Sequence, residues 1–192
     1  MRAAVEAHYP QPDPDPEEAP LTDDMHAEPY GGYGITYLRE AGGEETLRFD
    51  AIITHHGRKV AYVYNAGEGG SHRYQPVTVD AGAAFTEALA AFEQFAAEWN
   101  AGSEFAGYED HDQFVNRLID VHALNRRRGV LFLLDDESFW ETGVARQFRA
   151  GVAQEQAVER LSGPEYVHRN PRVWDRTVGE FVPVVSHTVE GQ

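Results

Sequence analysis

The pattern of apolar and polar positions changes near residue 34 of this 192-residue chain. The first 30 residues have almost no apolar run, whereas β-branched and aromatic residues then recur at the spacing of strands. Residues 34–40 and 46–56 read as adjacent strands, and Gly57 comes first in a two-residue type II′ turn that leads into a strand over 59–66. This hairpin is apolar on both faces, which predicts a central position covered by helices.

Two main helices are expected after the hairpin, followed by shorter elements. Residues 78–100 and 110–127 carry large apolar side chains at steps of three and four, and arginines close the second run, where the helix dipole favours cations. The sequence GVLFLLDD, residues 129–136, predicts a buried strand. The remaining expectations are a hairpin partner over 141–151, a short helix over 152–163, a strand over 165–170 and an apolar segment over 172–187, which Pro183 assigns to a sheet edge.

Together these elements predict an α+β fold, in which an antiparallel sheet of about five or six strands packs with two main helices. The length favours one domain, residues 31–192, behind a disordered acidic tail over residues 1–30. That tail holds eight acids, one base and six prolines, and it has too few apolar side chains to offset the entropy of ordering. It is interpreted either as a solubilising segment or as an acidic peptide that docks on a basic partner.

Charge and composition narrow the classes of function. The formal net charge is −16, but beyond residue 30 the chain has 24 acids and 15 bases, an ordinary balance for an acidic protein. This weakens the hypothesis of an acidic nucleic-acid mimic, and the shortage of clustered cations disfavours direct nucleic-acid binding. The absence of cysteine excludes disulfides and thiolate metal sites. With neither a long apolar run nor a signal sequence, we expect a cytoplasmic protein that requires no membrane.

The hairpin carries a recurrent signature. Its sequence resembles an uncharacterised family of bacterial and phage proteins with a strand of the form F-x-A-x-I, a glycine turn, a strand ending in V-x-N and a G-x-G-G loop. The matching positions are Phe49, Ala51, Ile53, Gly57, Val63, Asn65, Gly67, Gly69 and Gly70. Ala66 departs from the acid that commonly follows the asparagine. The resemblance extends over about residues 45–170, and it implies a shared architecture without an activity.

The loop NAGEGGSHRY is the first candidate site. Its glycines allow backbone N–H groups to converge on an anion, and the adjacent side chains add donors. It matches neither a dinucleotide fingerprint nor a P-loop, so the alternative is a flexible exit from the hairpin. His55 and His56 are strand neighbours and are expected to point to opposite faces, so only one can join the loop. The candidate residues are His55, Asn65, Gly67, Gly69, Gly70, His72, Arg73 and Tyr74.

A second candidate surface combines arginines with tryptophans in the C-terminal half. It forms if the end of the second helix meets the following hairpin, and arginine beside aromatic residues is typical of interface anchors. Charge balance with nearby acids is the alternative interpretation. Its members are Arg126, Arg127, Arg128, Trp140, Arg146, Arg149 and Trp174.

The preferred hypothesis is a non-catalytic interaction protein, an inhibitor or adaptor accessory to a phage or mobile element, with an unidentified protein partner. The rival is a small hydrolase or nucleotide-handling enzyme centred on residues 67–74, with His72 or His55 as acid/base and Arg73 as an anion clamp. No residue pattern singles out a catalytic set, a cofactor or a metal. His111 and His122, for example, lie ~16 Å apart on a helix that rises 1.5 Å per residue.

Overall fold

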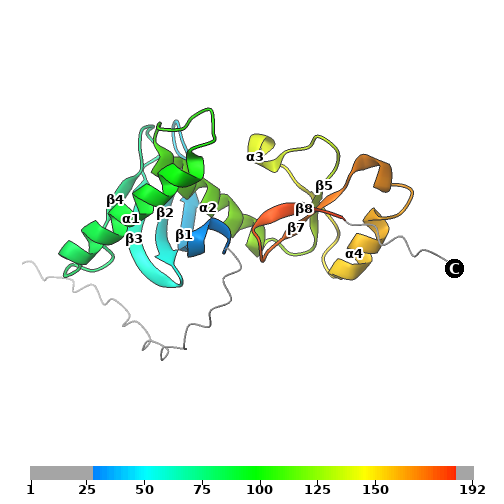
Figure 1. The fold of residues 1–192 in the computed structure, drawn as a ribbon, viewed down its shortest axis with the longest axis horizontal. Helices are drawn as coiled ribbons and strands as arrows, with labels where there is room; N and C mark the ends of the chain where they lie inside the picture. The colour runs from blue at the N-terminus through cyan, green and yellow to red at the C-terminus, as the bar shows by residue number, and fades with distance from the viewer. Residues whose placement is uncertain (1–27, 185–192) are drawn as a thin grey trace, which may run out of the picture.

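The computed structural model describes residues 28–184, and they form two packed units placed end to end (Figure 1). The first unit has a four-stranded antiparallel sheet in the order β1-β2-β3-β4, and the second has another in the order β6-β5-β7-β8. The chain is therefore α+β, as the sequence predicts. Residues 1–27 of the predicted tail lie outside the described residues.

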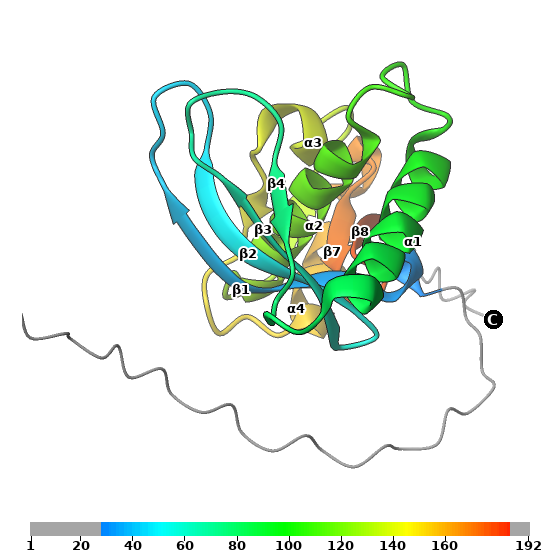
Figure 2. The ribbon, with the colours of Figure 1, turned by 90° about the vertical axis from the view of Figure 1, so that its left-hand side faces the viewer.

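The first unit packs two helices on one face of its sheet. The strands are β1 (Tyr33–Ala41), β2 (Arg48–His55), β3 (Arg58–Asn65) and β4 (Arg73–Gln75), and the helices are α1 (Gly82–Asn100) and α2 (Asp110–Arg126). Alternate residues of β2 and β3, including Ala51, Ile53 and Val63, are fully buried against Phe92 and Phe114 of the two helices. Both main helices are confirmed, and Figure 2 shows α1 lying along the sheet.

The β2–β3 hairpin has a different turn and register from those predicted. His56 and Gly57 form the turn with φ of 47° and 76°, and positive φ at both central residues is the pattern of a type I′ turn. A register shift after Ile53 then places Ile53 opposite Ala61 and Ile52 opposite Tyr62. The predicted type II′ turn has Gly57 as its first central residue, which would pair Ile53 with Tyr62. This turn is wrong, because His56 adopts the left-handed conformation that the prediction reserved for glycine.

The second unit is smaller and is built around β5 (Leu131–Leu133). Its other strands are β6 (Arg146–Gln147), β7 (Arg172–Asp175) and β8 (Glu180–Pro183), and its helices are α3 (Phe139–Thr142) and α4 (Gln154–Leu161). The buried strand, its hairpin partner, the short helix and the edge position of Pro183 are confirmed. The strand expected over residues 165–170 is wrong, because Val167–Arg169 form the 3-10 helix η2.

The single sheet of five or six strands is replaced by two four-stranded sheets. Periodicity marks which residues are strands, but strands join one sheet only if their edges meet, and here α2 separates β1–β4 from β5–β8 (Figure 1). Apolar side chains of α2 contribute to both units, with Phe114 and Leu118 in the first core and Leu124 in the second.

Tyr30 contacts both units. It belongs to the 3-10 helix η1 (Pro29–Gly32), and its ring centroid lies 6.2 Å from that of Phe114. Its hydroxyl donates to the carbonyl oxygen of Gly179 at 2.9 Å and to Glu180 Oε1 at 2.8 Å. Tyr30, which the sequence analysis assigned to the tail, is thus in contact with both units. Across residues 28–184, none of the helices has the length and apolarity required to cross a bilayer.

Candidate functional site

The glycine loop between β3 and β4 is held from inside by Asn65. The Asn65 side chain is buried, and its Oδ1 accepts from the Gly67 N–H at 2.8 Å and from the Thr46 hydroxyl at 3.2 Å. Its Nδ2 donates to the Gly70 carbonyl at 3.1 Å. The backbone groups of this loop are thus drawn toward the asparagine, which leaves fewer of them available to cradle an anion.

Gly67 closes the loop against the β1–β2 connection. Its carbonyl accepts hydrogen bonds from three consecutive N–H groups, those of residues 44–46. With φ of +81°, a Cβ added to Gly67 would lie 2.7 Å from the Cα of Gly43, which is inside van der Waals contact. Glycine is therefore required here by a close approach of two backbones, which is a structural reason for the first glycine of the G-x-G-G pattern.

His72 and Asp112 meet at the N-terminal end of α2. The His72 backbone N–H donates to Asp112 Oδ2 at 2.7 Å, and the Tyr74 hydroxyl donates to Asp112 Oδ1 at 2.6 Å. His72 Nδ1 accepts from Asn65 Nδ2, and its Nε2 donates to Asn116 Oδ1, both at 3.1 Å. This network assigns the imidazole proton to Nε2.

This cluster has the features of a structural hydrogen-bond network rather than those of a catalytic site. Both nitrogens of His72 are engaged, and its side chain is only 9% exposed beside Asp112 at 6%. Burial, and then the hydrogen bond to Asp112, raise the pKa of Tyr74 far above its usual range, so the phenol stays protonated. A general base needs a free lone pair within reach of a substrate, and here the lone pair of His72 is already occupied.

The structure separates the other predicted members of the loop site. Arg73 points to the side of β4 opposite His72 and Tyr74, because side chains alternate along a strand. His55 lies at the other end of β3, next to the turn, where it stacks on Tyr33 with ring centroids 4.4 Å apart. Burial lowers the pKa of His55. The structure therefore does not bring His55 or Arg73 together with His72.

The expected opposite orientation of His55 and His56 is also wrong. Their ring centroids lie 4.2 Å apart, since His56 has left the strand for the turn. His56 Nδ1 lies 3.0 Å from Glu28 Oε2, so these residues connect the start of the folded body to the hairpin.

The second candidate surface is assembled only in part. The end of α2 and the β5–β6 hairpin meet as anticipated, because the Phe148 N–H donates to the Val130 carbonyl at 3.0 Å and Gln147 bonds to the carbonyl of Arg128. Arg146 is paired with Glu137, with Nη2 to Oε1 at 2.7 Å. This pairing, followed by a backbone hydrogen bond from Leu134, lowers the pKa of Glu137.

The tryptophans of that surface belong largely to the core of the second unit. Trp174 is 5% exposed, and its indole N–H donates to Asn125 Oδ1 at 2.9 Å. Trp140 packs against Trp174 and is covered by Arg117, whose guanidinium carbon lies 3.5 Å from the ring centroid. One arginine of the set, Arg127, lies over the buried ring of Phe139, with its guanidinium carbon 5.8 Å from the ring centroid. The exposed arginines are Arg126, Arg127, Arg128, Arg146 and Arg149.

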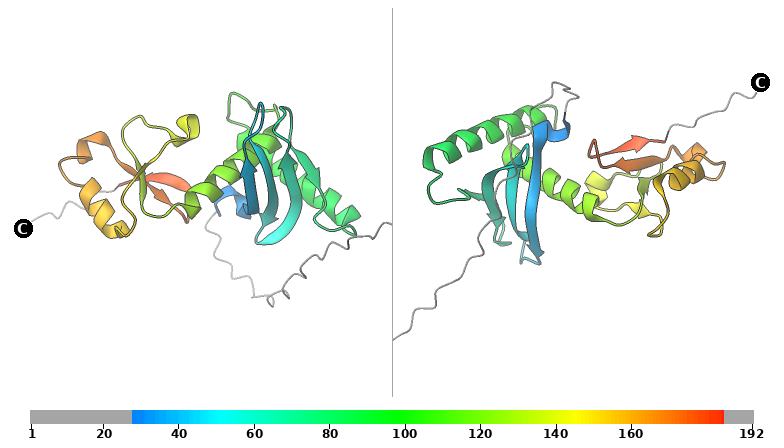
Figure 3. Two further views of the ribbon diagram at one scale, coloured as in Figure 1. Left: turned by 180° about the vertical axis from the view of Figure 1, so that it is seen from behind. Right: turned by 90° about the horizontal axis from the view of Figure 1, so that it is seen from below.

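The uncovered face of the first sheet carries an aromatic and cationic surface that the sequence analysis missed. Seen from behind, the strands β1–β3 lie in front of both helices, and nothing among residues 28–184 crosses them (Figure 3, left). The expectation that helices cover both faces of the hairpin is therefore wrong. We call this surface the tyrosine face and define it by Tyr37, Arg39, Arg48, Asp50, Ile52, Tyr62, Tyr64 and Arg73.

The tyrosine face is organised by cross-strand pairs. Tyr64 lies opposite both Asp50 and Arg73 on the neighbouring strands. The hydroxyl of Tyr62 donates to Asp50 Oδ1 at 2.6 Å, and this bond, together with burial, raises the pKa of Tyr62 to about 12. Tyr37 is 47% exposed. The alternation of Tyr62 and Tyr64 across β3 is the sequence signal that could have revealed the face.

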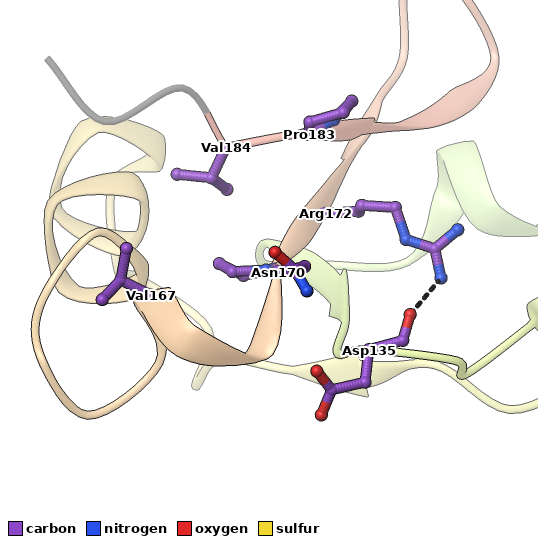
Figure 4. Close-up of a pocket in the computed structure, with 7 residues that line it drawn as sticks. Asp135, Val167, Asn170, Arg172, Pro183 and Val184 are labelled. Atoms are coloured by element: carbon purple, nitrogen blue, oxygen red, sulfur yellow. Dashed lines mark hydrogen bonds between the residues drawn. The ribbon is translucent and has the colours of Figure 1, made fainter.

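A further cavity lies in the second unit between η2, β7 and β8 and has a volume of about 560 Å³ (Figure 4). Its two charged lining residues, Asp135 and Arg172, are engaged by other groups of the second unit. Arg172 Nη2 donates to the carbonyl oxygens of Asp135 at 3.3 Å and Glu137 at 2.5 Å, and Arg169 Nε donates to Asp135 Oδ2 at 2.7 Å. It adjoins Val184, the last described residue, and its cationic lining residue, Arg172, is bound to two backbone carbonyl oxygens.

Within the described part of the chain, no group of three His, Asp or Glu side chains is arranged to hold a metal ion. Comparisons of the sequence and structure with protein-family models, curated proteins and solved structures find no match. The resemblance to an uncharacterised bacterial and phage family therefore remains a hypothesis.

Proposed function

We propose that this protein is a non-catalytic binding protein whose interaction surface is the tyrosine face. The observation that carries the proposal is an uncovered sheet face on which three tyrosines, Tyr37, Tyr62 and Tyr64, stand among three exposed arginines of an acidic chain. Tyrosine and arginine, together with tryptophan, are enriched among the residues that dominate binding energy at protein interfaces.

The glycine loop and the arginines of the second unit support an enzymatic or binding role less strongly than the tyrosine face supports a binding role. Both ring nitrogens of His72 are hydrogen-bonded, one to Asn65 and the other to Asn116, and Gly67 is required by its close approach to the backbone of Gly43. The arginines of the second unit lack the exposed tryptophan that would anchor a partner, since Trp174 is buried. An inhibitor or adaptor role for a phage or mobile element is compatible with a binding protein and rests on the family resemblance alone.

A charge-reversed face tests the proposal. The double variant Arg39→Glu/Arg73→Glu changes two exposed side chains on this face, and Arg149→Glu is the matched control because it is exposed on the second unit. Affinity capture from a lysate of the source organism is expected to recover a partner with the wild type and with Arg149→Glu, but not with the double variant. Equal recovery by the double variant, shown by circular dichroism to be folded, would contradict this assignment.

A further inference from the structure

We infer that the tyrosine face recognises an acidic, proline-rich peptide, and that the first such peptide it binds is the chain's own segment, residues 10–24. This inference rests on the proposed function and names the chemistry of the partner. The segment is PQPDPDPEEAPLTDD, which contains five prolines, six acids and no base.

The charges of the two surfaces are complementary. Arg39, Arg48 and Arg73 are exposed on the face, whereas its one acid, Asp50, already accepts the Tyr62 hydroxyl. The face is thus a cationic area on a chain whose formal net charge is −16. A segment that carries six carboxylates is attracted to this area and repelled by most of the remaining surface.

The aromatic groups suit proline in particular. The ring centroids of Tyr62 and Tyr64 lie 5.9 Å apart, and the Arg39 guanidinium carbon lies 4.8 Å from the centroid of the Tyr37 ring. Proline-rich sequences favour an extended helix that loses little entropy on binding, and they characteristically dock between aromatic side chains. From Pro12 to Pro16 proline alternates with aspartate, which places an apolar ring on both sides of Asp13 and Asp15, as the mixture of tyrosine and arginine requires.

The segment is long enough and starts in a suitable place. The described chain begins at Glu28, which is anchored to His56 at the β2–β3 turn, at one end of the face. The strands extend from this turn for eight residues, or ~26 Å at 3.3 Å per residue. Residues 10–24 span ~45 Å at the 3.1 Å rise of a polyproline helix, so they can follow the face along its length.

A single-stranded nucleic acid is the other anionic polymer that stacks on tyrosines. The observations favour the peptide because the net charge of the chain repels a free polyanion, whereas a tethered segment is present at an effective concentration in the millimolar range. Binding of a single-stranded oligonucleotide to the face would therefore contradict the inference.

The absence of cysteine allows a direct test with the full-length protein. A nitroxide attached to Ala19→Cys is expected to broaden the backbone amide signals of Asp50, Ile52, Tyr62 and Tyr64. The signals of α4, which lies in the second unit, should keep their intensity. Neutralising the segment with Asp13→Asn, Asp15→Asn, Glu17→Gln and Glu18→Gln should remove the broadening while every described residue stays unchanged. The control Glu155→Gln/Glu159→Gln, on the exposed side of α4, should preserve it.

Broadening that is uniform, or centred on Arg126–Arg128, would overturn the inference. So would a single-stranded oligouridylate that shifts the signals of the face in the wild type without competition from the segment. A synthetic peptide of residues 10–24 that shifts the same signals in the neutralised variant supports it. Failure of these experiments leaves the proposed function intact if the Arg39→Glu/Arg73→Glu variant still loses its captured partner, so the two failures are distinguishable.

Discussion

At the residue scale, two buried polar side chains explain why the glycine loop has its sequence. Asn65 binds the loop that follows it, and Asp112 receives hydrogen bonds from His72 and Tyr74, forty and thirty-eight residues earlier in the chain. A buried polar group that loses its partner costs more than the bond itself contributed, so each member of this network depends on the others.

Gly67→Ala should destabilise the protein by about 1–3 kcal/mol, the usual cost of overpacking. The added methyl group would meet the Cα of Gly43 at 2.7 Å, and alanine disfavours the φ of +81°. Urea unfolding measures the change. Gly42→Ala is the matched control because a Cβ at that position meets nothing within 4 Å, and an equal loss in the control would show that the close approach is not the cause.

Asp112→Asn should lower the free energy of unfolding by about 2 kcal/mol, because the neutral amide replaces a carboxylate whose two oxygens accept charge-assisted hydrogen bonds from the His72 N–H and the Tyr74 hydroxyl. Thermal unfolding should show the loss together with faster hydrogen exchange at His72. Asp136→Asn, at an exposed position after β5, is expected to change neither quantity. An unchanged exchange rate at His72 in Asp112→Asn would be evidence against the network.

At the element scale, the turn of the β2–β3 hairpin decides which side chains lie on each face of the sheet. With His56 and Gly57 in the turn and a register shift after Ile53, Ile52 and Tyr62 become partners on the open face. A slip of one residue in a strand moves every side chain to the other face, so the tyrosine face depends on this turn. Local sequence predicted the two strands and a tight turn correctly, but the turn type that it predicted is wrong.

The phenols of this fold make it sensitive to alkali. In the unfolded chain tyrosine loses its proton near pH 10, whereas folded Tyr62 keeps it to about pH 12 because of its bond to Asp50 and its burial. This stabilisation is fully present below pH 10 and is lost as the pH rises from 10 to 12. The pKa values of Tyr30 and Tyr74 are also raised, with burial as the largest cause, so these residues likewise stabilise the fold below pH 10 and lose that contribution as the pH rises.

Tyr62→Phe should therefore have a shallower fall in stability between pH 10 and 12 than the wild type. Urea midpoints measured across this range, together with tyrosinate absorbance, give the comparison. Tyr108→Phe serves as the control because Tyr108 is 69% exposed. Identical slopes for Tyr62→Phe and the wild type would exclude the bond to Asp50 as a source of alkaline sensitivity.

At the scale of the whole molecule, two sheets with separate cores share α2 and are joined by a small set of contacts around Glu180. Tyr30 donates to Gly179 and Glu180, and Arg117 Nη1 lies 3.5 Å from Glu180 Oε1. Arg117 also covers Trp140 of the second unit. This junction places the start of the folded chain against the turn between β7 and β8.

Tyr30→Phe should weaken the junction by about 1 kcal/mol, the typical net contribution of a hydrogen bond. Hydrogen exchange should accelerate in β7 and β8 and remain unchanged in β2 and β3, since the phenyl ring still packs on Phe114. Tyr108→Phe again provides the comparison. Equal acceleration in both units would show that they unfold together and would contradict a local junction.

The sequence by itself determined the α+β class, both main helices, the hairpin strands and the edge position of Pro183. Each of these depends on side-chain periodicity or backbone chemistry within a few residues. It also identified Asn65, Gly67, His72 and Tyr74 as members of one loop. Only the tertiary structure decided that the strands form two sheets, that His72 meets Asp112 and that the tyrosine face is uncovered. Periodicity shows which face of a strand or helix is apolar, but the element that packs on that face comes from a distant part of the chain.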